Sequence, residues 1–444
     1  FVLVLVWYAT YYLARNESAQ PLPLAFGGEA TPIDYARAIA DGALLALIAS
    51  LGLLQLGHET TPELAQLSSV ALFLYGLAAI PFKPRLGRLA LLVALPALAA
   101  SGAPSIALVL GVLGATLCRL SPEADVRRTA RWIVASTLAG ALVAAALGAW
   151  AWRLGAYDSR LQVLSLVREL AWFTWPAWPL ALWTLWRWRQ RFFSRHIAFP
   201  LACVGTSLLA CIAMGGSDRA LMLALPALAV LAAFALPTLQ RSTAAAIDWF
   251  SVFFFSIAAL TIWVLYVAMQ TGVPAKPAAN VARLAPGYTP TFSALALVLA
   301  VAGTIAWLWL VHWRTRRTRH PLWKSMVLPA SGVSLCWLLV MTLLLAPLDH
   351  ARSYRSLVIR IAQQLPQGDC IAAPGLSRAQ VAALEYIGGF TVDAITAASA
   401  SRCPYLLIVE AAQRPIPVDA RWQLIARERR NTSDEEVIAV YRRQ

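Results

Sequence analysis

Three ionisable side chains lie together in one short polar segment between two apolar runs. His58, Glu59 and Glu63 belong to the sequence HETTPE. Carboxylates and an imidazole at such a position can move a proton, bind a polar substrate or hold a metal ion beside lipid. The spacing is not that of a zinc protease, because Pro62 stands where that motif has its second histidine. The alternative is a solvated turn whose threonines cap the following helix.

A second charged turn precedes a leucine- and proline-rich segment. Asp218 and Arg219 lead directly into the apolar residues 220–237. A guanidinium binds phosphate through paired hydrogen bonds, and a lipid phosphate needs a cation at the depth of its headgroup. We therefore interpret Arg219, with Asp218 beside it, as a candidate ligand for the phosphate of a lipid substrate. The alternative is an Asp–Arg pair that only marks the ends of two helices.

Two further cations, Lys276 and Arg283, lie in the long connection 271–292. Connections of this length are often functional lids, so both residues are candidates for binding the same phosphate. The alternative is an ordinary solvated loop.

The composition shows what kind of chain must position these residues. It is 444 residues long, 59% hydrophobic and only 13% charged, which excludes an ordinary soluble globule. A hydrocarbon core of about 30 Å needs about 20 apolar residues per helix. We predict a mainly α-helical, polytopic transmembrane bundle over residues 1–348. About twelve spans are expected, near 1–14, 42–57, 65–81, 89–101, 104–118, 132–152, 170–187, 197–214, 220–237, 249–269, 293–313 and 326–346.

The basic residues are concentrated in alternate connections and predict the orientation of the chain. They cluster at 83–88, 119–131, 187–195, 241 and 314–324. The positive-inside rule makes these connections cytoplasmic. The segments 58–63, 215–219 and 271–292 then face outward together with residues 349–444. Because the net charge of +15 is explained by these topology signals, no nucleic-acid partner is expected.

The apolar run 89–118 has basic connections at both ends, so it must cross the membrane twice or not at all. As one helix it would also be too long, at roughly 45 Å. We predict a break at Ser101-Gly102-Ala103-Pro104, because Gly and Pro there disfavour a continuous helix.

Residues 349–444 predict a small, separate α/β domain. One helix is expected within 351–365 and another after Ser377, which with Gln380 resembles a capping box. Short strands are expected at 370–372, 390–395, 405–409, 422–426 and 437–441, the last two as a hairpin.

This domain contains two of the six cysteines, Cys370 and Cys403. On the outer side of the membrane a disulfide between them is expected, since that compartment is oxidising. The alternative is two buried free thiols.

Three segments together resemble the GT-C membrane glycosyltransferases, which take a sugar from a polyprenyl phosphate. Residues 44–67 (LLALIASLGLLQLGHETTPELAQL) resemble the span that ends in an outward acidic motif. Residues 99–104 (AASGAP) resemble a tight outward turn, and residues 217–233 (SDRALMLALPALAVLAA) resemble the basic turn before a Leu-Pro-rich span. Within that family the likeness is to the lipid A aminoarabinose transferase and protein mannosyltransferase group.

The resemblance implies roles for the charged residues. Glu63 is expected to be an acidic group of the active site, His58 and Glu59 its cavity or metal neighbours, and Arg219 the phosphate ligand. No bound cofactor is required, and a divalent metal beside the phosphate remains open.

This chain also differs from the family pattern. It has Glu63 where Asp is usual, and Ser101-Gly102 where a basic residue is usual. The family's principal acid lies on the first outward loop. Since the chain resembles the family from its second span onward, we expect the first span, the first outward loop and the acid upstream of residue 1.

The predicted function is transfer of a sugar from an undecaprenyl-phosphate carrier to a lipid or glycan acceptor at the periplasmic face of a bacterial inner membrane. Membrane lipids, the polyprenyl-phosphate sugar and the acceptor are the expected partners. The sequence has no Walker A or GxGxxG motif, so a nucleotide-driven mechanism is not indicated. Two alternatives remain, a lipid-linked-sugar flippase or transporter and a non-catalytic membrane scaffold.

Overall fold

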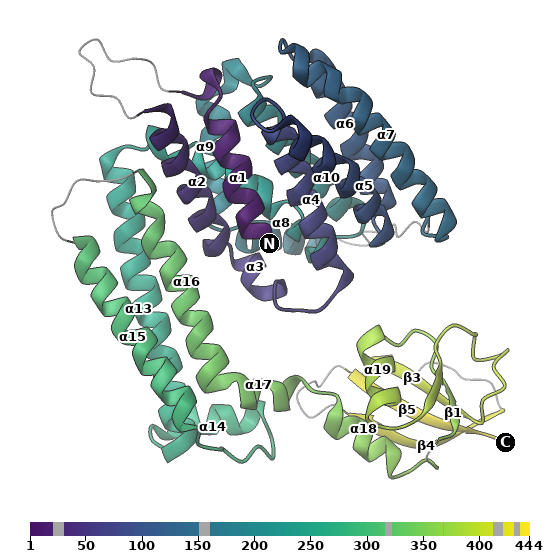
Figure 1. The fold of residues 1–444 in the computed structure, drawn as a ribbon. Helices are drawn as coiled ribbons and strands as arrows, with labels where there is room; N and C mark the ends of the chain where they lie inside the picture. Colours follow the sequence, from purple (N-terminus) through teal and green to yellow (C-terminus); the bar gives the residue numbers. More distant parts are fainter. Residues whose placement is uncertain (21–30, 151–159, 316–321, 367, 412–420, 430–435) are drawn as a thin grey trace. The chain divides into compact units, whose positions relative to one another are not determined.

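The protein folds into two compact units (Figure 1). A computed structural model describes residues 1–20, 31–150, 160–315, 322–366, 368–411, 421–429 and 436–444. The first unit comprises Phe1–Ala259 and Ala302–Leu338, and the second comprises Leu260–Val301 and Leu339–Gln444. Residues 316–321 of the predicted basic connection 314–324 lie outside the described residues.

The first unit is a bundle of helices. Its N-terminal part contains α1 (Val2–Ala14), α2 (Pro32–Ala49), α3 (Leu51–Leu56), α4 (Pro62–Ala79), α5 (Pro84–Ala100), α6 (Pro104–Leu120) and α7 (Ala124–Ala146). These are followed by α8 (Arg160–Phe173), α9 (Ala177–Arg187), α10 (Arg195–Ala213), α11 (Asp218–Met222) and α12 (Leu225–Ala233).

Proline starts several of these helices, because its fixed φ suits the first turn and its missing N–H costs nothing there. Helices α4, α5 and α6 begin at Pro62, Pro84 and Pro104. The predicted break between α5 and α6 is confirmed, and Gly102 supplies its turn with a φ of 94°.

Close packing in the bundle depends on small residues, as in many membrane proteins. Helices α5, α6 and α7 lie side by side (Figure 1). A Cβ on Gly76 of α4 would lie 3.1 Å from the carbonyl oxygen of Gly87 on α5, so the two backbones nearly touch. The buried hydroxyl of Ser136 on α7 donates to the carbonyl of Leu91 on α5 at 2.7 Å.

Three predicted spans are interrupted within their length, although the third of them, within Asp218–Thr238, is still long and apolar enough to cross a membrane. The segment 42–57 is divided at Ser50 into the end of α2 and the short α3. The segment 170–187 is divided between α8 and α9 beside Pro176, and 220–237 is divided between α11, α12 and a 3₁₀ turn. In the last two segments proline removes a backbone donor and obstructs the preceding turn. The segment 42–57 has no proline, and there the Leu51 N–H donates to the Trp175 carbonyl instead of continuing α2.

Three further helices contain residues of both units. They are α13 (Arg241–Thr271), α15 (Ala294–Thr315) and α16 (Val327–Leu339), the last continued by a π-turn (Val340–Leu344) and α17 (Leu345–Arg352). In the first unit, Arg314 of α15 pairs with Asp248 of α13. Six helices in the described part of the chain are long and apolar enough to cross a membrane. The predicted fold class, a mainly helical bundle with a small sheet domain, is confirmed; the number of spans stays a prediction.

The second unit contains α14 (Ala275–Leu284) and the C-terminal α/β domain, with α18 (Arg355–Ala362) and α19 (Arg378–Tyr386). The sheet has the order β2-β1-β3-β5-β4. Its strands are β1 (Cys370–Ala372), β2 (Thr391–Asp393), β3 (Tyr405–Ala411), β4 (Trp422–Arg429) and β5 (Glu436–Arg443). All five predicted strands are present, and β4 pairs antiparallel with β5 as expected.

The two helices of the domain pack against the sheet through Leu357, Ile361 and Leu384, which are buried with Leu407 and Val440. Helix α19 begins with the predicted capping box, in which the Ser377 and Gln380 side chains bind each other's backbone N–H. This reciprocal cap satisfies two donors that the helix start would otherwise leave unpaired.

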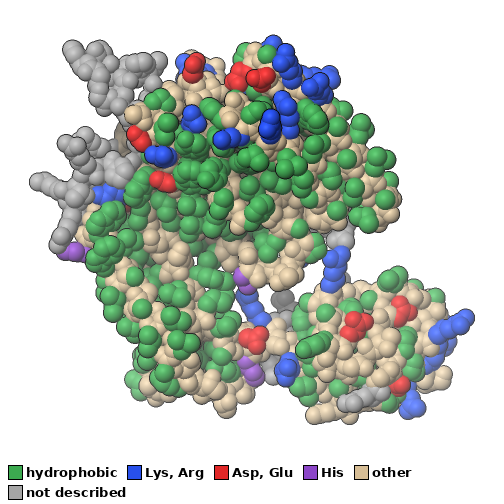
Figure 2. All heavy atoms as spheres, viewed as in Figure 1, with side chains coloured by type: hydrophobic (Ala, Val, Ile, Leu, Met, Phe, Trp, Pro, Cys, Tyr) green, Lys and Arg blue, Asp and Glu red, His purple; other side chains and the backbone are tan. Residues whose placement is uncertain are grey.

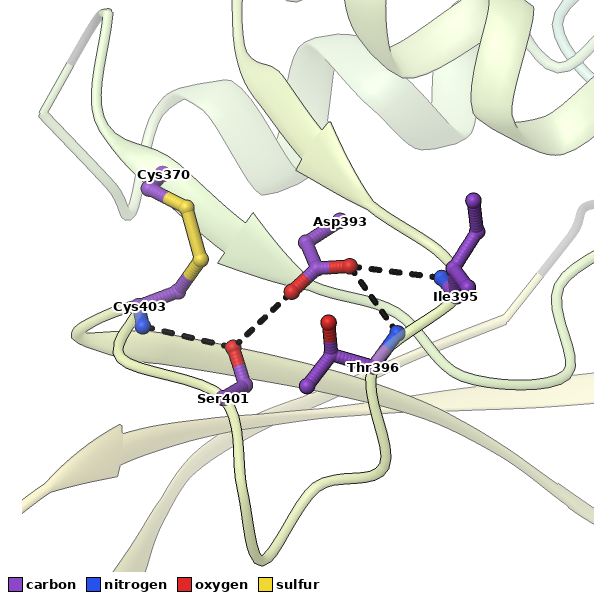
Figure 3. Close-up of a disulfide and its surroundings, with 6 residues drawn as sticks. All are labelled: Cys370, Asp393, Ile395, Thr396, Ser401 and Cys403. Carbon is purple, nitrogen blue, oxygen red and sulfur yellow. Dashed lines mark hydrogen bonds between the residues drawn. A yellow bond between two sulfur atoms is a disulfide. The ribbon is translucent and has the colours of Figure 1, made fainter.

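A disulfide joins Cys370 and Cys403, whose Cα atoms are 5.0 Å apart (Figure 3). Beside it, the carboxylate of Asp393 accepts hydrogen bonds from the backbone N–H groups of Thr396 at 3.0 Å and Ile395 at 3.3 Å (Figure 3). The hydroxyl of Ser401 donates to the same carboxylate at 3.4 Å. The disulfide and the hydrogen bonds to the Asp393 carboxylate therefore both hold the turn after β2 against the sheet.

Replacement of Cys370 and Cys403 together by alanine should lower the free energy of unfolding of this domain by about 3–4 kcal/mol, because the chain loses a cross-link across 33 residues. Hydrogen exchange of β1 and β3 in the purified protein measures the effect. Cys336→Ala, which removes a cysteine outside the disulfide, is the control. Equal exchange in both variants would contradict the prediction.

The hydrogen bond from the Thr396 backbone N–H, with those of the neighbouring donors, holds the pKa of Asp393 below its ordinary value. A lowered pKa means that the stabilisation is present above the unfolded pKa of about 4 and is lost as the pH falls below it. We expect the domain to lose stability as the pH falls from about 4 through the lowered pKa of Asp393, and Asp393→Asn to flatten that dependence. Thermal unfolding of both proteins over this range tests it, with Asp369→Asn as the control.

Candidate functional site

Arg219 binds two of the predicted acidic residues. Its Nη2 donates to Glu59 Oε2 at 3.3 Å, and its Nη1 lies 3.5 Å from Glu63 Oε2. Arg219 follows Glu59 by 160 residues, so only the tertiary structure brings the two charged turns together. The Arg219 and Glu59 side chains are 45% and 36% exposed, which leaves both within reach of a substrate from water.

Glu63 is the more enclosed of the two carboxylates, with a side chain that is 20% exposed. Its Oε2 is buried, and its contact with Arg219 does not have the geometry of a hydrogen bond. No other hydrogen-bond donor reaches this oxygen within the described residues. Glu63 lies in the first turn of α4, where the helix dipole favours a negative charge. The result is a buried carboxyl oxygen that could accept one more hydrogen bond.

Two short helices, α3 and α11, position this cluster. Helix α3 directly precedes the turn that contains Glu59. The N–H of its first residue, Leu51, donates a hydrogen bond to the carbonyl of Trp175 at 3.1 Å. Helix α11 holds Arg219 and is capped by the Ser217 hydroxyl, which accepts from the backbone N–H of Ala220 at 3.4 Å. Helix α11 packs against α3, α4 and α8.

The turn between α5 and α6, which the family resemblance predicts to face outward, lies beside the end of α4 that carries Glu63. The side chain of Gln66, one turn after Glu63, donates to the carbonyl oxygen of Ser101 at 2.8 Å. The α5–α6 turn therefore lies beside the first two turns of α4. Here the site has an amide and a carbonyl where the resemblance led us to expect a basic side chain.

A cavity of about 1020 Å³ adjoins this cluster through Asp218, the neighbour of Arg219. Its polar lining is provided by Arg168, Glu169 and Asp218, and its apolar lining is mainly aromatic. The remaining lining residues are Leu51, Ala171, Trp172, Phe173, Trp175, Trp178, Phe250, Phe254 and Phe255. Large, mostly apolar cavities with a few polar groups are typical small-molecule sites.

The aromatic lining is the part that sequence reasoning missed. In the sequence, Trp172, Trp175 and Trp178 are typical of an interfacial belt, and Glu169 beside Arg168 is typical of an ion pair at a helix end. The close spacing of three tryptophans in seven residues, with Pro176 between them, was the available signal.

The other predicted site residues are placed as follows. The ring of His58 packs against Trp337, with 5.0 Å between centroids, instead of joining Arg219. Lys276 and Arg283 lie on α14 in the second unit, where Arg283 Nη2 is 3.5 Å from the Asn280 side-chain oxygen. Asp218 lines the cavity as described above.

The described residues assemble no group of three or more His, Cys, Asp and Glu side chains suited to a metal ion. Arg219 itself lies between Glu59 and Glu63, in the place where a cation would bind both carboxylates. The donor set therefore does not fit a protein-bound metal, and no chemical step is assigned to one.

The sequence matches no family model and no curated protein. The structure, in contrast, matches crystal structures of ArnT from Cupriavidus metallidurans, one in the apo state and one bound to undecaprenyl phosphate. The match has a TM-score of 0.52 at 14% sequence identity, and covers 99% of this chain and 82% of ArnT. The chain has the ArnT fold.

ArnT is the lipid A aminoarabinose transferase, so the fold predicted from the three short segments is confirmed. Together with the long apolar helices, the ArnT fold identifies the chain as a multi-pass membrane protein. At this level of identity the comparison concerns the fold alone.

The cavity wall leaves no space for a side chain at Gly52. A Cβ at this position would lie 2.2 Å from the ring of Phe173, which lines the cavity. Gly52→Ala should lower the stability of the detergent-solubilised protein by about 1–3 kcal/mol, because the ring or α3 must move. Gly205→Ala is the control, since no atom lies within 4 Å of its added Cβ and alanine favours the helix. Equal melting temperatures for the two variants would show that the α3–Phe173 contact is not tight.

Proposed function

We propose that this protein is a glycosyltransferase that moves a sugar from an undecaprenyl-phosphate carrier to a lipid or glycan acceptor. The reaction is placed at the periplasmic face of a bacterial inner membrane, with the Glu59–Glu63–Arg219 cluster and the C-terminal domain on that side. The observation that carries the proposal is the position of Arg219 between two carboxylates, beside a large aromatic cavity in an ArnT fold.

The fold comparison supports the carrier, because one of the two matched ArnT structures is bound to undecaprenyl phosphate. The cavity supports it independently. Its aromatic walls suit the first prenyl units of a lipid carrier, and its charged edge at Asp218 suits the phosphate and the sugar.

In the proposed reaction the acceptor oxygen forms a bond to the anomeric carbon of the sugar. The bond between that carbon and the phosphate oxygen breaks, and polyprenyl phosphate leaves with the electron pair. Glu63 takes the acceptor proton, since its Oε2 is buried beside the site and accepts no hydrogen bond.

Arg219 neutralises the charge that develops on the leaving phosphate. A guanidinium has five N–H donors in a planar fork, so Arg219 can hold a phosphate oxygen while it keeps one carboxylate. We further propose Lys276 and Arg283 of α14 as additional phosphate ligands. Glu59 holds Arg219, and we propose His58, packed against Trp337, as a group at the edge of the site.

The proposal is tested by transfer of a radiolabelled sugar from its undecaprenyl-phosphate carrier to extracted envelope lipids and glycans. The protein is assayed in the membranes in which it is produced. Labelled acceptor that depends on the protein supports the proposal. Movement of the labelled carrier across the bilayer without labelled acceptor would instead identify a transporter. If neither activity is detected, the scaffold alternative is favoured.

Arg219→Ala should lower the transfer rate by about 10²–10³-fold through loss of charge stabilisation, and Arg219→Lys should restore part of it. Glu63→Gln should lower it by about 10²–10⁴-fold while the protein remains folded, because the amide cannot accept the proton. Arg128→Ala, which removes an exposed arginine at the opposite end of the bundle, is the control. Unchanged turnover in Arg219→Ala would exclude the phosphate role.

A further inference from the structure

A second, smaller cavity lies at the other end of α4. It has a volume of about 290 Å³ and is bounded by the last turn of α6, residues 121–122 and the first turn of α10. Leu77, whose carbonyl oxygen binds Arg195 of this cavity, is 14 residues after Glu63 on the same helix. At 1.5 Å per residue the two sites are roughly 21 Å apart.

Arg195 is the charged residue inside this cavity, and it is only 7% exposed. Its Nη1 lies 3.2 Å from Glu123 Oε2, and its Nη2 donates to the Leu77 carbonyl at 3.0 Å. Its Nε is buried and has no hydrogen-bond partner within the described residues. A buried N–H without a partner is costly, so an acceptor that reached this Nε from the cavity lined by Arg195 would be stabilised.

A second guanidinium lies at the rim. Arg127 Nη1 donates to the carbonyl oxygens of Ser121 and Pro122, both of which line the cavity, at 3.0 and 2.5 Å. The Ser121 hydroxyl accepts from the backbone N–H of Glu123 at 3.4 Å, which leaves its own proton to donate. The guanidinium groups of Arg195 and Arg127 therefore lie near one carboxylate, that of Glu123, and the site has a net positive charge.

The start of α10 adds to this charge. Its N-cap, Ser194, makes no side-chain hydrogen bond to the helix. The Ser194 carbonyl accepts from the N–H groups of Ile197 and Ala198, so only the N–H groups of the first two helical residues, Arg195 and His196, are without a capping side chain. Uncapped N–H groups and the helix dipole attract anions, phosphate in particular. Figure 2 shows Lys and Arg side chains gathered at one end of the first unit, and Arg119 and Arg127 next to this cavity are exposed.

The apolar surroundings indicate that the anion is carried by a lipid. Phe193 and Leu120 line the cavity and are 83% and 68% exposed, so they extend the cavity as an apolar surface open to the membrane. A volume near the lower limit of small-molecule sites admits a phosphate headgroup and leaves the acyl chains outside, along the helices. A free phosphate would make no use of the apolar surface.

We propose that this cavity binds the headgroup phosphate of an anionic membrane phospholipid, held by Arg195 Nε, the Ser121 hydroxyl and Arg127. Basic pockets between helices are a known way to recognise such headgroups. Because the site is separate from the Glu59–Glu63–Arg219 cluster, it does not depend on the proposed transfer activity.

The test uses the full chain purified in neutral detergent. Native mass spectrometry counts bound phosphatidylglycerol or phosphatidylcholine during titration, and the melting temperature is followed in parallel with each lipid and with inorganic phosphate. We expect phosphatidylglycerol to bind and to raise the melting temperature, and phosphatidylcholine and inorganic phosphate to have little effect at the same concentration.

Arg127→Gln and Ser121→Ala are the informative variants, because both change the cavity without removing the buried Arg195. Arg127→Gln should weaken phosphatidylglycerol binding by about tenfold, as loss of one charged ligand predicts. The matched control is Arg128→Gln, an exposed neighbour 3.9 Å from Asp125, with an expected change of less than about twofold.

Equal binding of the two lipids, an equal effect of inorganic phosphate, or equal losses in Arg127→Gln and Arg128→Gln would each overturn the proposal. In the last case Arg195 would be a structural link between α4, α10 and Glu123 and nothing more. The melting temperature without lipid shows whether a variant is folded, and a variant that is not folded is replaced by Ser121→Ala alone.

Discussion

Two arginines from distant parts of the sequence hold the opposite ends of α4, and the arrangement of the first unit depends on these contacts. At one end Arg219 binds Glu59 and Glu63; at the other Arg195 binds the carbonyl of Leu77, 118 residues away. Apolar side chains gain little by leaving lipid for another helix, so polar links and close contacts between small residues must specify the packing. Charged groups are also tolerated best at the ends of spans, where water can reach them.

These end contacts explain why the chemistry is concentrated in two places. The Arg219 end collects three turns, an incompletely paired carboxylate and the aromatic cavity, all features of a site that handles a polar group attached to a lipid. The Arg195 end collects excess positive charge and a buried N–H without a partner. Between the ends the helix packs through residues such as Gly76 and Phe73, which serve packing alone.

The ArnT fold persists at 14% identity because a membrane constrains the kind of residue more than its identity. Lipid-facing positions accept any large apolar side chain, so few of them carry a recognisable signal. The turns differ, because a proline, a glycine or a charge there has a specific structural task. For this reason short segments around Glu63, Ser101 and Arg219 predicted the fold when the whole sequence matched nothing.

The sequence by itself determined the mainly helical class, the break at Gly102, all five strands and the two charged turns, because each follows from residues close together in the chain. Tertiary structure alone decided that Glu59, Glu63 and Arg219 form one cluster, that His58 turns to Trp337 instead, and that three tryptophans line a cavity. The physical reason is that a span-end tryptophan or a loop arginine has the same local pattern whether it faces lipid, water or a partner. Only the packing of helices far apart in sequence distinguishes these cases.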